Sequence, residues 1–327
     1  MSATEATKQI RDFAGELLEG STFSLEKPIS HQGMSVVPIV IAETTVSQDY
    51  INAAAALERG TLVITEAGDA VNSLLAKNTG DIPVLIEEAE VLVTGDSQDR
   101  IVVASVIIQP GEEIRIPVKC VHAPHGLNRG STYSSIGGGS VPLKSGMRRM
   151  KYQSVMIDVE HYMPETAVDQ SEVWAEVERQ GKRLGIKDTS KYADAMDKIQ
   201  KKTREIAEEI RNRLPENTCG FIVINTDGQP VALEFYRNSK AFRHRSGVLE
   251  SLVAEYCDNE KKPVSEKTAR EEALQLVGHL KRARKKEAIS AKDSSNIVVG
   301  LGDLKGEAVA GETREGLAKL LYFTLGM

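Results

Sequence analysis

Cysteine and histidine residues at short spacing are the first candidates for chemistry in this sequence. Cys120, His122 and His125 form the pattern C-x-H-x-x-H, and thiolate and imidazole are ligands that Zn²⁺ prefers. A structural zinc site uses four such ligands, and no second pair lies nearby in the sequence. We therefore expect a buried Cys120 followed by two loop histidines. The alternatives are a metal site formed by Cys120, His122 and His125, and a nucleophilic Cys120 activated by His122.

A second group of polar residues combines carboxylates with a guanidinium group. Three glutamates follow a short apolar run: Glu87, Glu88 and Glu90. Paired carboxylates can carry acid–base or divalent-metal chemistry, but we favour a solvated strand end for these three. A polar set precedes the apolar run 101–108: Gln98, Asp99 and Arg100. This set either orients a ligand, with Arg100 binding a phosphate or carboxylate, or caps its own turn.

Glycine-rich and basic runs are the remaining motifs. Gly137, Gly138 and Gly139 have the backbone freedom of a phosphate-binding loop, but the pattern GxxxxGK[ST] is absent, so we expect no nucleotide P-loop. The run from His279 to Lys286 (HLKRARKK) is expected to form a solvated basic helix face. Aromatic residues for base stacking are missing there. We therefore expect no nucleic-acid binding except through this basic run.

Composition narrows the class of protein. The 327 residues include 41 Lys+Arg and 47 Asp+Glu, and the formal charge of −6 disfavours a general nucleic-acid binder. The apolar runs are far shorter than the roughly 18–20 residues that cross a bilayer, so we expect no membrane association. The three cysteines are widely spaced, and the N-terminal residues lack an apolar signal core. These features predict a soluble, cytoplasmic protein without disulfides.

The helices and strands predicted around these candidate residues indicate an α+β fold with a β-rich N-terminal half. An amphipathic helix is expected at 8–19, and an Ala-rich helix at 49–60 with Ser47 or Asp49 as its N-cap. Short β-branched runs predict strands at 36–42, 62–65, 84–86, 101–108, 113–121 and 152–159. The residues from His122 to Met147 predict a long loop rich in glycine and serine.

The C-terminal half is expected to be richer in helices. Apolar periodicity predicts helices at 170–184 and 191–214, a helical hairpin through which copies of the chain would form a homo-oligomer. Asp227-Gly228 predicts a β-hairpin between 221–225 and 231–236. Further helices are expected at 246–256 and 265–288, and strands within 297–327. We divide the chain into 1–160 and 161–327, and expect the two halves to fold as one cooperative unit.

Several short fragments, taken in order, resemble one protein family. They are YINAAAALERG at 50–60, LVITE at 62–66, VNSLLAKN at 71–78, VLIEEAEVL at 84–92, GDSQDR at 95–100, IPVKCV at 116–121 and DQSEVWAEV at 169–177. In this order they resemble the ARG and Rhodanese-Phosphatase-superfamily-associated protein domain, a prokaryotic family, over residues 30–260. The family's Cys-Val-Glu is replaced here by Cys120-Val121-His122, and its Gln-Asn-Arg by Gln98-Asp99-Arg100.

Through the family's name, the resemblance also implies a class of ligand. The family's name implies a link to ADP-ribosylglycohydrolases and phosphatases, and hence an ADP-ribose-like or other phosphorylated, nucleotide-derived ligand. The candidate ligand-binding residues are Glu66, Glu90, Gln98, Asp99, Arg100, Cys120 and His122. The leading hypothesis is a ligand-binding or accessory protein. The alternatives are a metal-assisted hydrolase that uses Glu90, His122 and His125, and an interaction protein that assembles through its helical hairpin. No motif identifies a cofactor or a reaction.

Overall fold

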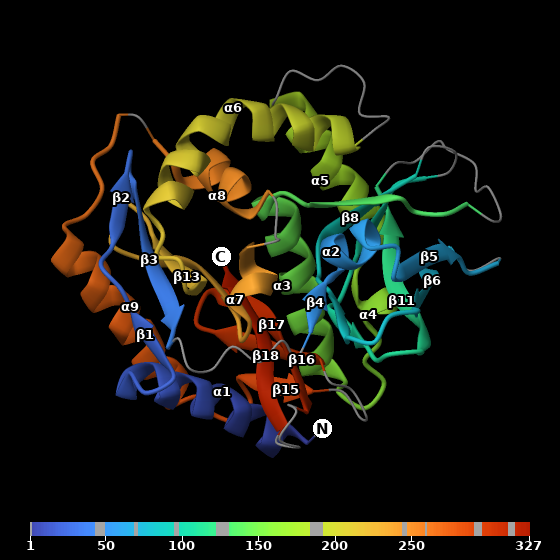
Figure 1. The fold of residues 1–327 in the computed structure, drawn as a ribbon, viewed down its shortest axis with the longest axis horizontal. Helices are drawn as coiled ribbons and strands as arrows, with labels where there is room; N and C mark the ends of the chain where they lie inside the picture. Colours follow the sequence, from blue (N-terminus) through green and yellow to red (C-terminus); the bar gives the residue numbers. More distant parts are fainter. Residues whose placement is uncertain are drawn as a thin grey trace. The chain divides into compact units, whose positions relative to one another are not determined.

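The chain consists of two compact units (Figure 1). In this computed structural model, the described residues are 2–42, 50–68, 71–94, 98–121, 131–183, 192–243, 247–258, 260–290, 296–312 and 318–327. Unit 1 comprises Met1–Asp49, Thr203–Arg243 and Leu252–Met327, and unit 2 comprises Tyr50–Lys202 and His244–Ser251. Each unit combines helices with β-sheet, which confirms the predicted α+β class.

Unit 1 is built on one large antiparallel sheet. Over its described residues the strand order is β1-β3-β13-β14-β18-β17-β16-β15, and β2 pairs with β3. The strands are β1 (Phe23–Leu25), β2 (Ile29–His31), β3 (Met34–Ile41), β13 (Thr218–Ile224), β14 (Pro230–Tyr236), β15 (Ala288–Ser290), β16 (Asn296–Leu301), β17 (Leu304–Glu312) and β18 (Ala318–Gly326). The predicted hairpin around Asp227-Gly228 is confirmed as β13 and β14. Because β3 pairs with β13 and β14 pairs with the last strand, β18, the sheet contains strands from near both ends of the sequence.

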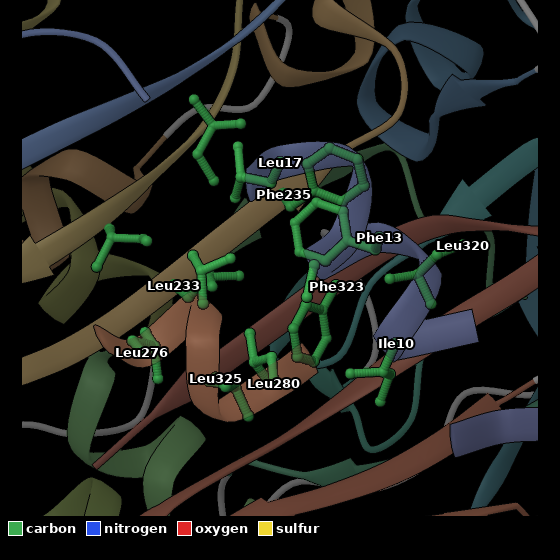
Figure 2. Packing of buried hydrophobic residues seen from close by; sticks show 14 of the residues in the cluster. Ile10, Phe13, Leu17, Leu233, Phe235, Leu276, Leu280, Leu320, Phe323 and Leu325 are labelled. Carbon is green, nitrogen blue, oxygen red and sulfur yellow. The ribbon is translucent and has the colours of Figure 1, made fainter. Parts of the chain in front are cut away.

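Helices α1 (Ala3–Glu19) and α9 (Glu266–Lys281) supply the apolar core of unit 1 together with this sheet. Figure 2 shows Phe13 of α1 beside Phe235 and Phe323 of the sheet. The ring centroids of Phe13 and Phe235 lie 4.2 Å apart. Full burial of one such side chain stabilises a fold by about 1.5–3 kcal/mol. The interior of unit 1 on this side is therefore a conventional aromatic and aliphatic core.

Unit 2 contains two sheets. Over its described residues the strand orders are β12-β8-β9-β11-β6-β5 and β10-β7-β4. The strands are β4 (Ile51–Asn52), β5 (Leu62–Glu66), β6 (Ser73–Asn78), β7 (Val84–Ile86), β8 (Glu90–Val93), β9 (Arg100–Val102), β10 (Val106–Ile108), β11 (Glu113–Cys120) and β12 (Ser135–Gly138). The segment before β12 also pairs with β5, through a bridge between Thr65 and Thr132. The two edge strands of the larger sheet are thus connected through this segment.

The remaining helices lie mostly in unit 2 and at its boundaries. They are α2 (Ala53–Glu58), α3 (Val141–Ile157), α4 (Pro164–Ala167), α5 (Gln170–Arg183), α6 (Tyr192–Arg213), α7 (Ser239–Arg243) and α8 (Val248–Tyr256). The structure confirms the helices that we predict at 170–184 and 191–214. The Ala-rich helix begins later than predicted, because Asn52 is its N-cap and accepts the N–H of Ala55 at 3.0 Å.

The largest difference from the sequence-based expectation concerns α3. The sequence predicts a loop up to Met147 and a strand at 152–159, but β12 and α3 occupy the described part of this stretch. The buried face of α3 carries Lys144, Arg148 and Lys151 as well as Leu143. Because these three cations interrupt the apolar stripe, the periodicity that marks an amphipathic helix is missing.

Two further predictions are wrong at element boundaries. The single strand predicted at 101–108 is two strands, β9 and β10, separated at Ser105, whose hydroxyl accepts the N–H of Glu88 at 2.8 Å. The basic helix predicted at 265–288 ends at Lys281, and the strand β15 begins at Ala288. The residues between them form turns, so the basic run is only partly helical.

Candidate functional site

The polar residues of unit 2 gather at one end of its larger sheet. Cys120, the last residue of β11, is the cross-strand partner of Arg100, the first residue of β9. Cross-strand partners point to the same face, and alternation along β11 puts Ile116 on this face too. Ile116 pairs with Leu74, which pairs with Glu66 at the end of β5. The register therefore places Glu66, Arg100 and Cys120 on one face.

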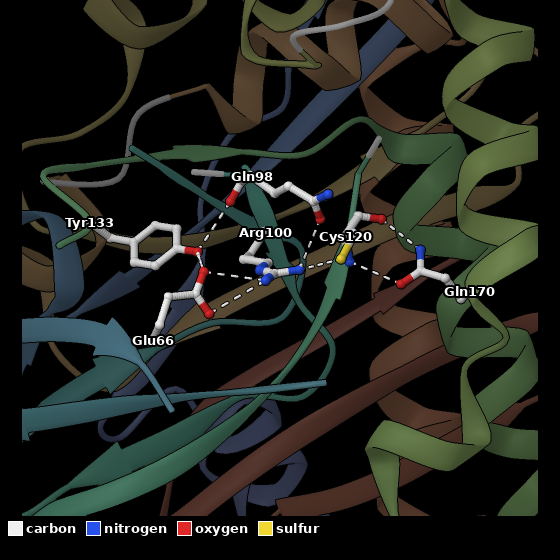
Figure 3. Close-up of polar contacts among 6 residues, drawn as sticks. All are labelled: Glu66, Gln98, Arg100, Cys120, Tyr133 and Gln170. Carbon is white, nitrogen blue, oxygen red and sulfur yellow. Dashed lines mark hydrogen bonds and ion pairs between the residues drawn. The ribbon is translucent and has the colours of Figure 1, made fainter. Parts of the chain in front are cut away.

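Arg100 is the centre of a buried hydrogen-bond network (Figure 3). Its Nη2 donates to both carboxylate oxygens of Glu66, at 3.3 and 3.4 Å. Its Nη1 donates to Oε1 of Gln98 at 3.3 Å and to Sγ of Cys120. The hydroxyl of Tyr133 lies 2.7 Å from Oε1 of Glu66 and 3.1 Å from the carbonyl oxygen of Gln98. The network thus joins β5, β9, β11 and the segment before β12.

Burial sets the protonation states in this network. It raises the pKa of the Cys120 thiol, and the charge of Arg100 offsets only part of that effect. It also raises the pKa of Tyr133, whose hydrogen bond to Glu66 favours the neutral phenol further. Burial opposes the charge of Arg100, but Cys120, Tyr133 and Glu66 together raise its pKa. At neutral pH, Cys120 and Tyr133 are therefore uncharged, and Arg100 and Glu66 form the ion pair.

Gln170 attaches α5 to this end of the sheet. Its Nε2 donates to the carbonyl oxygen of Cys120 at 2.6 Å, and its Oε1 accepts the N–H of Cys120 at 3.0 Å. The helix begins here because the carboxylate of Asp169 accepts the N–H groups of Ser171 and Glu172, at 2.7 and 3.2 Å. The amide of Gln170 therefore takes the place of a neighbouring strand and fixes the backbone of Cys120 (Figure 3).

A second buried cluster begins at the turn between β7 and β8. Ala89 in this turn has a φ of 61°, a left-handed conformation that is costly for a residue other than glycine. The N–H of Gly139 donates to the carbonyl oxygen of Ala89 at 2.7 Å, and a Cβ at position 139 would lie 2.7 Å from that oxygen. Glycine is therefore required for this approach. Because Ser140, the next residue, is the N-cap of α3, the contact between Gly139 and Ala89 places the start of α3 beside the turn between β7 and β8.

Glu88 in this turn is the centre of the second cluster. It is fully buried and forms ion pairs with Arg148 and Lys151 of α3. Burial acts to raise the pKa of Glu88, but Arg148, Lys151 and Lys144 lower it to about 2. The expectation of a solvated strand end is therefore wrong. The exposed fractions are 0%, 0% and 6% for Glu87, Glu88 and Glu90.

Some buried polar atoms of unit 2 have no hydrogen-bond partner within the described residues. Among them are Nε of Arg100, Oγ of Ser131 and Nε1 of Trp174. Ser131 adjoins the network, since its carbonyl oxygen accepts the N–H of Glu66 at 3.4 Å. Trp174 lies one helical turn after Gln170 on α5, and hence on the same face. All three atoms can donate a hydrogen bond, and a buried donor without an acceptor costs about 1–3 kcal/mol.

A family match covers nearly the whole chain. The family described as ARG and Rhodanese-Phosphatase-superfamily-associated Protein domain matches residues 22–323. The chain belongs to this family. The match confirms the resemblance and extends it beyond residues 30–260 at both ends. No curated protein and no solved structure matches the chain. In the described part of the chain, no helix has the length and apolar character needed to cross a membrane.

The site residues predicted from the sequence fall into three groups. Four of them meet in the network: Glu66, Gln98, Arg100 and Cys120. Asp99 and Glu90 are buried, and a carboxylate oxygen of Glu90 accepts the N–H of Glu87 at 2.9 Å. His122 and His125 lie outside the described residues. Over the residues that are described, no three His, Cys, Asp or Glu residues are grouped so that they could hold a metal ion.

Sequence reasoning missed the partners that complete both clusters. Tyr133 lies in the stretch that the sequence predicts as a loop, and nothing in its neighbours marks it as buried. The cations of α3 do leave a signal, because Lys144, Arg148 and Lys151 follow the spacing i, i+4, i+7 of one helix face. That signal is readable only if the segment is first recognised as a helix.

Proposed function

We propose that unit 2 binds a phosphorylated, nucleotide-derived small molecule of the ADP-ribose type at the Arg100 network. The observation that carries this proposal is the set of three buried donor atoms on Arg100, Ser131 and Trp174 without a described acceptor. A ligand with anionic oxygens supplies acceptors for such donors, and a guanidinium N–H suits a phosphate oxygen. The family's name links it to ADP-ribosylglycohydrolases, which narrows the anionic ligand to this class.

The density of buried charge in unit 2 supports a binding role over a purely structural one. The buried ionisable residues are Glu66, Glu87, Glu88, Glu90, Asp99, Arg100, Lys119, Lys144, Arg148, Lys151 and Glu250. Apolar replacements of buried ion pairs are often as stable or more stable, so such pairs are weak devices for stability. Buried groups with perturbed pKa values concentrate at functional sites. We therefore assign this interior to ligand binding.

The state of Cys120 favours binding over covalent catalysis. The thiolate is the nucleophilic form of cysteine, and burial raises the pKa of this thiol. Its Sγ accepts from Nη1 of Arg100, and its backbone is held by Gln170. Cys120 thus acts as a positioning residue that helps to hold the guanidinium of Arg100 in one orientation.

Calorimetric titration of the full chain with ADP-ribose, and separately with AMP, tests the proposal. Ser131→Ala and Trp174→Phe each remove one donor and leave the surrounding side chains in place. A hydrogen bond to a charged group contributes about 1.5–3 kcal/mol, so each variant should bind at least about tenfold more weakly. Ser134→Ala is the matched control, because this serine is exposed and lies in the same segment.

The thermal unfolding temperature of each variant separates lost binding from lost folding. We expect both donor variants to unfold near the temperature of the wild type, since neither atom has a described partner to lose. Wild-type protein that binds neither ligand would contradict the proposal. So would Ser131→Ala and Trp174→Phe variants that bind as tightly as Ser134→Ala.

A further inference from the structure

A cluster of positive charge lies at the C-terminal end of α9 in unit 1 and in the turn that follows it. We call it the basic turn, and its members are Lys281, Arg282, Arg284, Lys285 and Lys286. All five are exposed, and none forms an ion pair with another residue in the described ranges. Without these five cations, the formal charge of the chain falls from −6 to −11. The basic turn is therefore a local exception on an otherwise acidic chain.

The backbone of the basic turn packs against the core of unit 1. Ala283, in its middle, is 3% exposed, and its N–H donates to the carbonyl oxygen of Leu280 at 3.1 Å. The carbonyl oxygen of Ala283 accepts from Nε of Arg11 on α1 at 2.7 Å. Leu280 belongs to the apolar cluster of Figure 2. The backbone that carries the cations is thus held in place, which lowers the ordering cost of binding a partner.

Stabilisation of α9 does not account for the cluster. Cations interact favourably with the C-terminal end of a helix, but the effect falls off within the last turn. His279 and Lys281 lie in the last turn of α9, whereas Arg284, Lys285 and Lys286 lie beyond its end. Like charges at this spacing repel one another. An anionic partner would relieve that repulsion.

We infer that the basic turn binds the phosphodiester backbone of nucleic acid. Protein partners usually meet an interface with an apolar or aromatic centre, and amphipathic membrane binding needs an apolar face. Among the described residues, no exposed large apolar side chain lies within 279–290. That stretch also contains no Phe, Tyr or Trp for base stacking. The contacts are therefore with phosphates alone, and they carry no sequence preference.

The number of phosphates contacted fixes the expected salt dependence. For single strands, the slope of log K against log salt is about −0.7 per neutralised phosphate. Five contacts give a slope of about −3.5, which is a loss of about 100-fold in affinity between 50 and 200 mM salt. The variant Arg284→Glu/Lys285→Glu/Lys286→Glu leaves two cations, so its loss over the same range should be about 7-fold.

Fluorescence anisotropy of a labelled 20-nucleotide RNA of mixed sequence measures these slopes on the full chain. The matched control is Lys198→Glu/Lys201→Glu/Lys202→Glu on α6, which makes the same charge change at three exposed positions. We expect the control to keep the wild-type slope and the basic-turn variant to bind at least tenfold more weakly at 50 mM salt. A second RNA of different sequence should bind with equal affinity.

Three results would overturn the inference. One is the absence of RNA binding by the wild type at 50 mM salt. Another is equal weakening by the α6 control, which would assign binding to net charge. The third is tighter, basic-turn-dependent binding of a poly-glutamate peptide or of vesicles that contain phosphatidylserine, which would assign the basic turn to an acidic protein or a membrane surface.

Discussion

Replacement of Glu88 by glutamine removes one negative charge from the interior of unit 2 and keeps the shape of the side chain. The pKa of Glu88 is lowered from 4.5 to about 2 by Arg148, Lys151 and Lys144, against the opposing effect of burial. At 1.36 kcal/mol per pKa unit, the ionised form contributes about 3 kcal/mol to the free energy of unfolding. Glu88→Gln also leaves two buried cations without this carboxylate, and breaking a buried pair costs about 3–5 kcal/mol.

The pH dependence gives the reasoning a sharper test than the stability loss alone. Because the pKa of Glu88 is lower in the folded chain than in the unfolded chain, its contribution is fully present above pH 4.5. It is lost as the pH falls from 4.5 towards 2. The wild type should therefore lose about 3 kcal/mol from this group over that window, whereas Glu88→Gln lacks this component. The stability difference between the two proteins should narrow as the pH falls.

The single tryptophan of the chain makes the assay specific for unit 2. Trp174 lies in α5, in the same unit as Glu88, so its fluorescence during urea unfolding reports on that unit. Unfolding is measured at pH 7, 5, 4 and 3 for the wild type, Glu88→Gln and the control Glu178→Gln. Glu178 is exposed and pairs with Lys182 on the surface of α5, so the control should match the wild type. A Glu88→Gln protein as stable as the control at pH 7, or a difference that is constant with pH, would refute the reasoning.

Three further predictions concern other buried contacts of unit 2. Arg100→Leu should lose about 3–5 kcal/mol of stability by urea unfolding, because the buried carboxylate of Glu66 loses its cationic partner. Glu66→Leu/Arg100→Leu should recover part of that loss, and a double variant less stable than Arg100→Leu contradicts this. Gly139→Ala should lower the unfolding temperature and weaken the loss of stability at acidic pH, because its Cβ would meet the carbonyl oxygen of Ala89. Gly137→Ala is the control, because a Cβ there has open space and should change neither quantity. Equal effects of the two variants would disprove the close approach. Iodoacetamide at pH 7.5 should label Cys120 slowly in the folded chain and rapidly in urea, because burial raises the pKa of this thiol and shields it. Peptide mass spectrometry follows the labelling. Rapid labelling of Cys120 in the folded chain would contradict this, because it would show an accessible thiolate.

The fold of unit 1 was largely predictable because its elements bury apolar side chains with regular spacing. The stripe Ile10, Phe13 and Leu17 marks α1, and these residues lie in the aromatic and aliphatic core (Figure 2). The Asp227-Gly228 turn likewise marks the hairpin of β13 and β14. Pairing between strands far apart in the sequence was not predictable. The contact of β3 with β13 depends on the whole sheet, and no local pattern encodes it.

The candidate site was only partly predictable for a different reason. The sequence suggests Glu66, Gln98, Arg100 and Cys120, and the structure brings these four together. Their partner Tyr133 comes from a stretch whose glycine and serine content predicts a loop. Residues of the same type can cap a turn or enter a buried network, and the pairing that decides between these roles is long-range. Spacing alone therefore identifies donors and acceptors but not which of them meet.

The failure to predict α3 and the location of the Glu88 cluster have one physical cause. Hydrophobic periodicity identifies a helix by the apolar face that it buries. The buried face of α3 is instead occupied by Lys144, Arg148 and Lys151, and a helix buries such groups only where a counter-charge such as Glu88 receives them. The usual pattern of an apolar buried helix face is broken here, and such departures are expected where function constrains a segment. Among the described residues of the two charge clusters, the Arg100 network contains a buried donor without an acceptor, Nε of Arg100. We therefore propose that the charged face of α3 supports the proposed binding site and does not contact the ligand.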